Sequence, residues 1–160
     1  MKTFKLASTT GMFAIAAMLS TQAHADNLRY TSNVNAVTVS SPNTLAVPLN
    51  NAGATTINFT NPTAGLVAIT FSAECAVSST QVQSWANLDI LVDGGIVSPT
   101  ESDNAFCTAI APDGVEIWST NSITVARNLS AGQHSVSVNA NFGFGSGTIR
   151  LDDIALHVAR

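Results

Sequence analysis

The segment LVAITFSAECAV, residues 66–77, decides the fold class of this 160-residue chain. Its odd-numbered positions are all apolar, whereas Thr70, Ser72 and Glu74 on the even positions are polar or charged. A period of two is typical of a strand that buries one face. The segment also carries Cys75, one of two cysteines, so we expect any bond of that thiol to be fixed to the centre of the fold.

Other strand-like segments follow one another along the chain, separated by Pro, Gly and Asn, and no window after residue 25 has a helical period of 3.6. They are residues 26–41 (one or two edge strands), 54–60, 85–93, 96–97, 115–119, 122–129, 133–142 and 148–158. The segment Asp93-Gly94-Gly95 predicts a tight hairpin. We therefore predict an all-β domain, a single antiparallel sandwich of jelly-roll type, with an immunoglobulin-like sandwich as the second choice.

The last of these strands changes phase. Ile149 and Leu151 are apolar on odd positions, but Ile154 and the apolar residues after it lie on even positions. Because a strand alternates strictly, its buried face must switch between them. The sequence predicts a β-bulge at Asp152 and Asp153.

The N-terminal residues have the pattern of a secretory signal peptide. Lys2 and Lys5 precede an apolar run over residues 11–19, and a small-residue cleavage pattern follows at residues 23–25. The apolar run is too short to span a bilayer. We expect residues 1–25 to be removed and residues 26–160 to form one secreted or periplasmic domain, without a membrane-inserted segment.

Residues 26–160 contain no lysine, and their four arginines stand against ten carboxylates, a formal charge of −6. Such a surface repels phosphate backbones and anionic lipids, which argues against nucleic-acid and membrane-surface partners. It favours neutral polymers, cations or another protein. In an exported chain, Cys75 and Cys107 are expected to form a disulfide that closes a loop of 32 residues.

Catalytic motifs are absent from the sequence of residues 26–160. No serine lies in a G-x-S-x-G motif, and the two histidines, His134 and His157, have no nucleophile or metal-ligand cluster near them in sequence. We expect both histidines to be ordinary surface or edge residues. The protein is not expected to be an enzyme, although a pair of carboxylates assembled across the fold would be invisible in sequence.

Two kinds of binding residue stand out instead. Asp152 and Asp153 offer oxygen ligands for calcium, with further carboxylates available from elsewhere in the chain: Asp26, Asp93, Glu101 and Asp103. The alternative is that this acidic pair caps the bulge. Exposed aromatic rings would stack on the apolar face of a sugar. The candidates are Trp85, Trp118 and Tyr30, followed by Phe142 and Phe144, and each tryptophan would serve equally well in the core.

The C-terminal segment TIRLDDIAL, residues 148–156, resembles the last strand of jelly-roll carbohydrate-binding modules. In that family the acidic residues of this strand often contribute to a structural calcium site, which the resemblance places at Asp152 or Asp153. The layout of Cys75 and Cys107 also looks like that of fimbrial subunits, although the terminal tyrosine pattern is missing. The strand-rich composition is similar to that of C1q and tumour-necrosis-factor trimers.

Together these observations predict an exported, non-enzymatic sandwich that binds or adheres to carbohydrate or another extracellular polymer, with structural calcium as an option. The alternative is a structural subunit that assembles with copies of itself, as a trimer or a fimbria-like polymer.

Overall fold

In the computed structural model, which describes residues 25–81, 83–97, 104–109 and 116–160, the segment around Cys75 is the centre of a five-stranded sheet. This sheet, sheet A, contains β1 (Asn27–Asn33), β2 (Val37–Ser40), β5 (Gly65–Ser78), β9 (Ser119–Leu129) and β11 (Thr148–Ala159). Its order is β1-β11-β5-β9, and β2 pairs with the first part of β11. All pairings are antiparallel.

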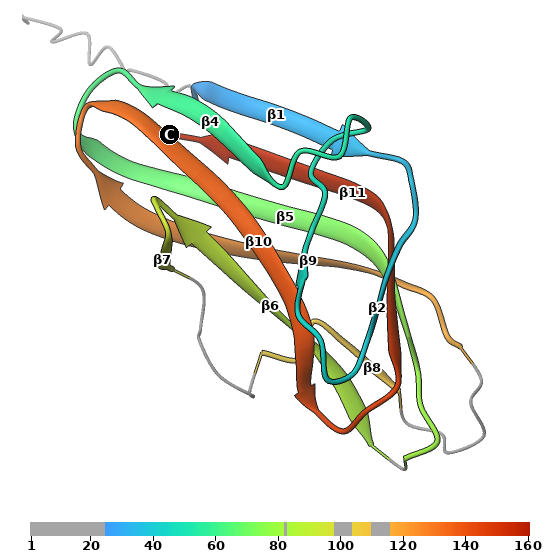
Figure 1. Ribbon diagram of the computed structural model, residues 1–160. Coiled ribbons are helices and arrows are strands. Elements are labelled where there is room, and N and C mark those ends of the chain that lie inside the picture. The colour runs from blue at the N-terminus through green and yellow to red at the C-terminus, as the bar shows by residue number, and fades with distance from the viewer. Residues whose placement is uncertain (1–24, 82, 98–103, 110–115) are drawn as a thin grey trace, which may run out of the picture.

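The second sheet, sheet B, is built around the strand β10. It contains β3 (Leu45–Ala46), β4 (Thr56–Asn61), β6 (Ser84–Val92), β7 (Gly95–Ile96), β8 (Cys107–Ala109) and β10 (Gly132–Phe144). Its path is β3-β10-β6-β7, with β4 also on β10 and β8 also on β6. Figure 1 shows β10 running between β4 and β6, with β11, β5 and β9 in the other layer. The all-β antiparallel sandwich is therefore confirmed.

The core lies between the two sheets and consists of the alternate side chains of the long strands. On β5 all six odd-numbered residues from Val67 to Val77 are buried, as the period of two predicts. Sheet B contributes buried residues from β4, β6 and β10: Ile57, Phe59, Ala86, Leu88, Ile90, Val92, Val136, Val138 and Ala140. Burial of these apolar faces against each other is the main force that stabilises a two-layer fold.

The predicted bulge in β11 is confirmed. Asp152 pairs with Glu74, but the next regular pair is Ala155 with Ser72, so β11 has one extra residue between them. Asp153 adopts a positive φ of 45°, and its backbone N–H donates to Asp152 Oδ1 at 2.9 Å. Ile149 and Leu151 before the bulge and Ile154 after it are fully buried. The bulge thus turns the apolar face inward on both sides.

The predicted hairpin after β6 is confirmed as well, because Asp93 and Gly94 have positive φ angles of 52° and 79° and the chain returns as β7.

One boundary prediction is wrong. Residues 115–119 and 122–129 were predicted as two strands, but β9 runs unbroken from Ser119 to Leu129 against β5. The polar residues near Asn121 mark the edge position of β9 in sheet A and not a turn. Residues 1–24, most of the 99–114 loop, Glu101 and Asp103 lie outside the described residues.

The disulfide between Cys75 and Cys107 is present and joins β5 of sheet A to β8 of sheet B. Next to it, the rings of Phe71 and Phe106 pack with their centroids 5.7 Å apart. The Phe106 backbone N–H donates to the Ala86 carbonyl at 2.9 Å, and Asn104 Nδ2 donates to the Leu88 carbonyl at 2.6 Å. Residues 104–109 are therefore held to the edge of β6.

Replacing both cysteines, as Cys75→Ala with Cys107→Ala, is expected to lower the free energy of unfolding by about 3 to 4 kcal/mol. The reason is that the closed loop of 32 residues restricts the unfolded chain by about that amount. Urea unfolding followed by tryptophan fluorescence measures the loss, and reduction of the wild-type protein should reproduce it. Unchanged stability in both experiments would contradict a stabilising role for the bond.

Candidate functional site

The outward-facing side of sheet B is the candidate site. Since Ala86, Leu88 and Ile90 of β6 point into the core, the residues between them point outward. On β10 the inward residues are Val136, Val138 and Ala140, which leaves the asparagines between and after them on the outer side. The resulting sheet B face consists of Trp85, Asn87, Asp89, Asn139, Asn141 and Phe144.

The register between β6 and β10 sets these residues side by side in three rows. Asp89 pairs with Asn139, Asn87 with Asn141, and Trp85 with Phe144. A register shift between Phe142 and Phe144 turns Phe144 onto the same side as Trp85. The face therefore combines amide and carboxylate groups in its middle with aromatic rings at one end.

The two rings at that end are stacked on each other. The centroids of Trp85 and Phe144 are 4.8 Å apart and their planes are inclined by 20°. Trp85 is half-buried, whereas Phe144 is 53% exposed. Stacking on Trp85 holds an otherwise exposed ring in a fixed position, where its outer surface is open to an apolar ligand group.

Two oxygen atoms in the middle of the face have no hydrogen-bond donor among the described residues. Asn87 is only 4% exposed, and its Oδ1 is buried without a partner, as is Oδ1 of the half-buried Asp89. A buried acceptor left unpaired costs about 1 to 3 kcal/mol. Within the described residues no donor removes that cost, so the face would be stabilised by a ligand that supplies hydrogen-bond donors.

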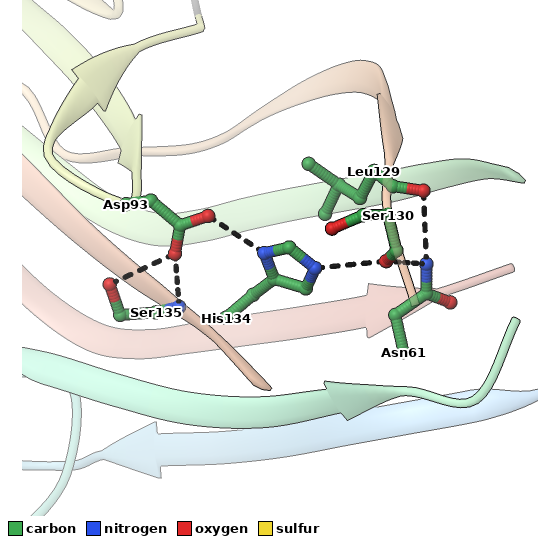
Figure 2. Close-up of polar contacts among 6 residues, drawn as sticks. All are labelled: Asn61, Asp93, Leu129, Ser130, His134 and Ser135. Carbon is green, nitrogen blue, oxygen red and sulfur yellow. Dashed lines mark hydrogen bonds and ion pairs between the residues drawn. The ribbon is translucent and has the colours of Figure 1, made fainter. Parts of the chain in front are cut away.

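An ion pair between the buried His134 and the half-exposed Asp93 lies at the other end of the same two strands. His134 Nδ1 is 2.7 Å from Asp93 Oδ2, and His134 Nε2 is 3.0 Å from the Ser130 carbonyl (Figure 2). Both of these partners are acceptors, so the two hydrogen bonds form together only when both ring nitrogens carry a hydrogen, which is the imidazolium form of the ring. Asp93 Oδ1 also accepts from the Ser135 backbone N–H at 2.8 Å. The network fixes the turn after β6 to the start of β10.

The interaction between Asp93 and His134 shifts the pKa of both side chains. Burial on its own would raise the pKa of Asp93, but hydrogen bonds from His134 and Ser135 outweigh it and lower the pKa of that carboxyl. The hydrogen bond to Asp93, helped by the one to Ser130, raises the pKa of His134 above its ordinary value. With both ring nitrogens engaged, His134 has no free position to act as a base. Its role in this structure is to hold the turn.

The expectation that both histidines are surface or edge residues is therefore wrong for His134, of which only 9% is exposed. It packs on Phe59 of β4, with ring centroids 5.7 Å apart, and its charge is compensated by Asp93. The prediction is confirmed for His157, which is exposed on sheet A.

The three aromatic residues predicted to bind ligand do not come together. Trp85 belongs to the sheet B face, where it contacts Phe144. Tyr30 lies on the outer side of sheet A, 58% exposed, with its ring in edge contact with His157. Trp118 directly precedes β9 of sheet A and is 43% exposed.

The predicted calcium ligands Asp152 and Asp153 lie at the bulge on sheet A. Asp152 Oδ1 accepts the backbone N–H of Asp153, which is the capping arrangement given as the alternative. Among the described residues, no group of three or more His, Cys, Asp and Glu side chains is arranged to hold a metal ion. Calcium binding at this pair stays a prediction.

Two open grooves lie at the margins of the sandwich. One, of 420 Å³, lies between β1 and β4 and is lined by residues that include Arg29, Asn58, Phe59 and Gln133. The other, of 310 Å³, lies next to the disulfide between Phe106, Cys107 and Ile117. Neither groove includes any of the six residues of the sheet B face. In the described part of the chain, no helix is long and apolar enough to cross a bilayer.

The Asp93–His134 pair is expected to stabilise the protein in a limited pH range. Because the pKa of His134 is raised, its contribution is complete below the unfolded-state pKa of about 6.5 and is lost as the pH rises through the folded-state value. Because the pKa of Asp93 is lowered, its contribution is complete above about pH 4 and is lost as the pH falls through the folded-state value.

Replacing His134→Gln should therefore lower the free energy of unfolding by about 1 to 2 kcal/mol near pH 5, a small loss because half of the Asp93 side chain is exposed. The loss should be smaller at alkaline pH, above the raised pKa of His134. Urea unfolding at a series of pH values measures the difference, and the exposed His157→Gln is the matched control. An equal loss at every pH would contradict the charged state of the pair.

The comparisons with known proteins give structural matches only. No protein-family model matches the chain, and no curated protein matches it. Among solved structures, a family 35 carbohydrate-binding module from Clostridium thermocellum is similar at 15% identity, over 84% of this chain and 98% of that one, with a TM-score of 0.36.

Two further structural matches are of the same kind. The sugar-binding C-terminal domain of EclA matches at 13% identity, over 91% of this chain and 89% of that one, with a TM-score of 0.38. A family 35 module from Paenibacillus barcinonensis matches at 19%, over 83% and 97%, with a TM-score of 0.28. The matches thus include the class that the C-terminal strand resembles. At these identities and TM-scores they transfer neither a ligand nor a site residue to this chain.

Proposed function

We propose that this protein is an exported, non-enzymatic carbohydrate-binding module that holds a glycan chain on the sheet B face. The observation that carries the proposal is the row of groups on that face: a stacked aromatic pair followed by Asn87 and Asp89, whose Oδ1 atoms lack donors. Recognition of sugars needs these two components, because a pyranose has apolar C–H faces and a rim of hydroxyl groups.

The hydroxyl groups of a sugar are the donors that the two oxygens lack. Each hydroxyl donates one hydrogen bond and accepts others, so the amides of Asn139 and Asn141 beside them can donate to the same ring. The C–H face of the next ring would then lie on Phe144, which Trp85 supports from below. Along the pair of β6 and β10, a stacked aromatic pair is followed by planar polar groups. This succession suits the repeating sugar units of a polysaccharide.

The length of the face favours a polymer over a single sugar. The strand β10 has 13 residues, which at about 3.3 Å per residue extend over about 40 Å. Further polar residues continue the outer side of sheet B beyond the site, since Ser135 and Gln133 of β10 pair with Asn58 and Thr60 of β4. A glycan chain could lie along β10 without leaving the sheet.

Two observations support the export of the protein to an oxidising compartment. The disulfide between Cys75 and Cys107 is typical of oxidising compartments, and the pattern of residues 1–25 is that of a signal peptide. A non-enzymatic role is supported by His134, whose two ring nitrogens are both engaged.

The substitution Phe144→Ala is expected to weaken binding of the best glycan about tenfold, or by about 1.4 kcal/mol, because it removes the exposed stacking surface. Trp85→Ala should weaken it at least as much by removing the support of that ring. Affinity electrophoresis against a panel of soluble polysaccharides identifies the glycan that binds. Calorimetry with oligosaccharides of that glycan then gives the ratio of the dissociation constants of variant and wild type.

Trp118→Ala is the matched control, since it removes a 43% exposed tryptophan that lies outside the face. We expect its affinity to equal that of the wild type. If no polysaccharide is retarded, or if only Trp118→Ala weakens binding, the proposed function of the sheet B face is wrong.

A further inference from the structure

The polar floor of the sheet B face, formed by Asn87, Asp89, Asn139 and Asn141, favours one kind of ligand. Both of its unpartnered buried atoms, Oδ1 of Asn87 and Oδ1 of Asp89, are acceptors. A ligand group that carries only acceptors, such as a carboxylate or a sulfate, would leave both of them unpaired. The floor therefore requires donors, and a group with several donors satisfies it best.

The charged groups around Asp89 also favour a ligand that carries donors. No contact among the described residues places an arginine beside Asp89: Arg29 lines the groove with Asn58 and Gln133, Arg127 lies next to Gly95, Arg150 next to Glu116, and Arg160 next to Thr63. The nearby Asp93 is already paired with His134. Asp89 thus faces the ligand without a protein cation, in a chain whose formal charge is −4.

We infer that the sheet B face selects a glycan with free amino groups, and that Asp89 binds the ammonium group of a glucosamine-type unit while Asn87 accepts a hydrogen bond from the same unit. The inference rests on the proposed function, because it names the ligand of the same site. An ammonium group brings three donors and a positive charge, and hydrogen bonds between charged groups are about twice as strong as neutral ones.

The two acceptors can reach such a ligand with a small rearrangement. The last side-chain torsion of Asn and Asp has a broad distribution, so a rotation about χ2 moves each buried oxygen at little cost. Asp89 is only partly buried, so its carboxylate needs the smaller movement of the two. The acetylated form of the same sugar has a single amide N–H, no charge and an added methyl group, so it satisfies the floor less well.

The test compares oligosaccharides of glucosamine with oligosaccharides of N-acetylglucosamine of the same length, by calorimetry at mildly acidic pH. We expect the free amine to be bound about tenfold more tightly by the wild type. Asp89→Asn should bring the ratio close to one, whereas Glu74→Gln, which removes an exposed carboxylate from sheet A, should leave the ratio unchanged.

A second measurement does not depend on how well the variant folds. The affinity of the wild-type protein for the amine form should fall as salt is added, because ions screen a charged contact. Neutral glucans and polygalacturonate complete the panel. Equal affinity for the amine and acetylated forms, or tighter binding of polygalacturonate, would overturn the amino-sugar inference and leave glycan binding intact. Absence of binding to every glycan would overturn the proposed function as well.

Discussion

The alternate burial along β5 is the constraint on which the rest of the structure depends. This strand pairs with β11 on one side and with β9 on the other, and its odd-numbered residues meet the inner side of sheet B. A slip of one residue in either pairing would turn Ile69 and Phe71 to solvent and Thr70 into the core. The register of sheet A is fixed for that reason, and the disulfide at Cys75 ties sheet B to it.

The candidate site is a consequence of the same rule applied to sheet B. Because Leu88, Ile90 and Val138 supply the buried apolar surface of β6 and β10, the residues between them lie on the opposite side of the sheet from the core. Asn87, Asp89 and the two asparagines opposite them occupy these positions. Polar residues there add little to the apolar core, and in the proposed function they bind the ligand. The Asp93–His134 pair keeps the two strands in register at the end of the face.

Much of the fold could be predicted from the sequence, because its strongest signals are local. The period of two in β5, the change of phase at Asp152 and the turn at Asp93-Gly94 each require only a few consecutive residues. The alternation of β10 places His134 on the same side as Val136, but its ion pair could not be predicted in this way, since the partner Asp93 lies 41 residues away. The continuity of β9 depends on its pairing with β5, which overrides the polar residues near Asn121.

The site was only partly predictable for a similar reason. Trp85 and Phe144 were recognised as aromatic candidates, but alternation gives the face of a residue and not its neighbour on the next strand. The pairs of Asn87 with Asn141 and of Asp89 with Asn139 follow from the order of β6 and β10 in sheet B. Polar residues at alternate positions of two otherwise apolar strands are the signal that would have indicated them.

The most direct test of the account is an NMR titration of the isotope-labelled protein with an oligosaccharide that it binds. The account predicts that the largest shift changes fall on the backbone and side-chain amides of Asn87, Asp89, Asn139 and Asn141, with the ring signals of Phe144 moving in parallel. Shift changes centred on Tyr30 and His157 of sheet A, with those four residues unchanged, would contradict it.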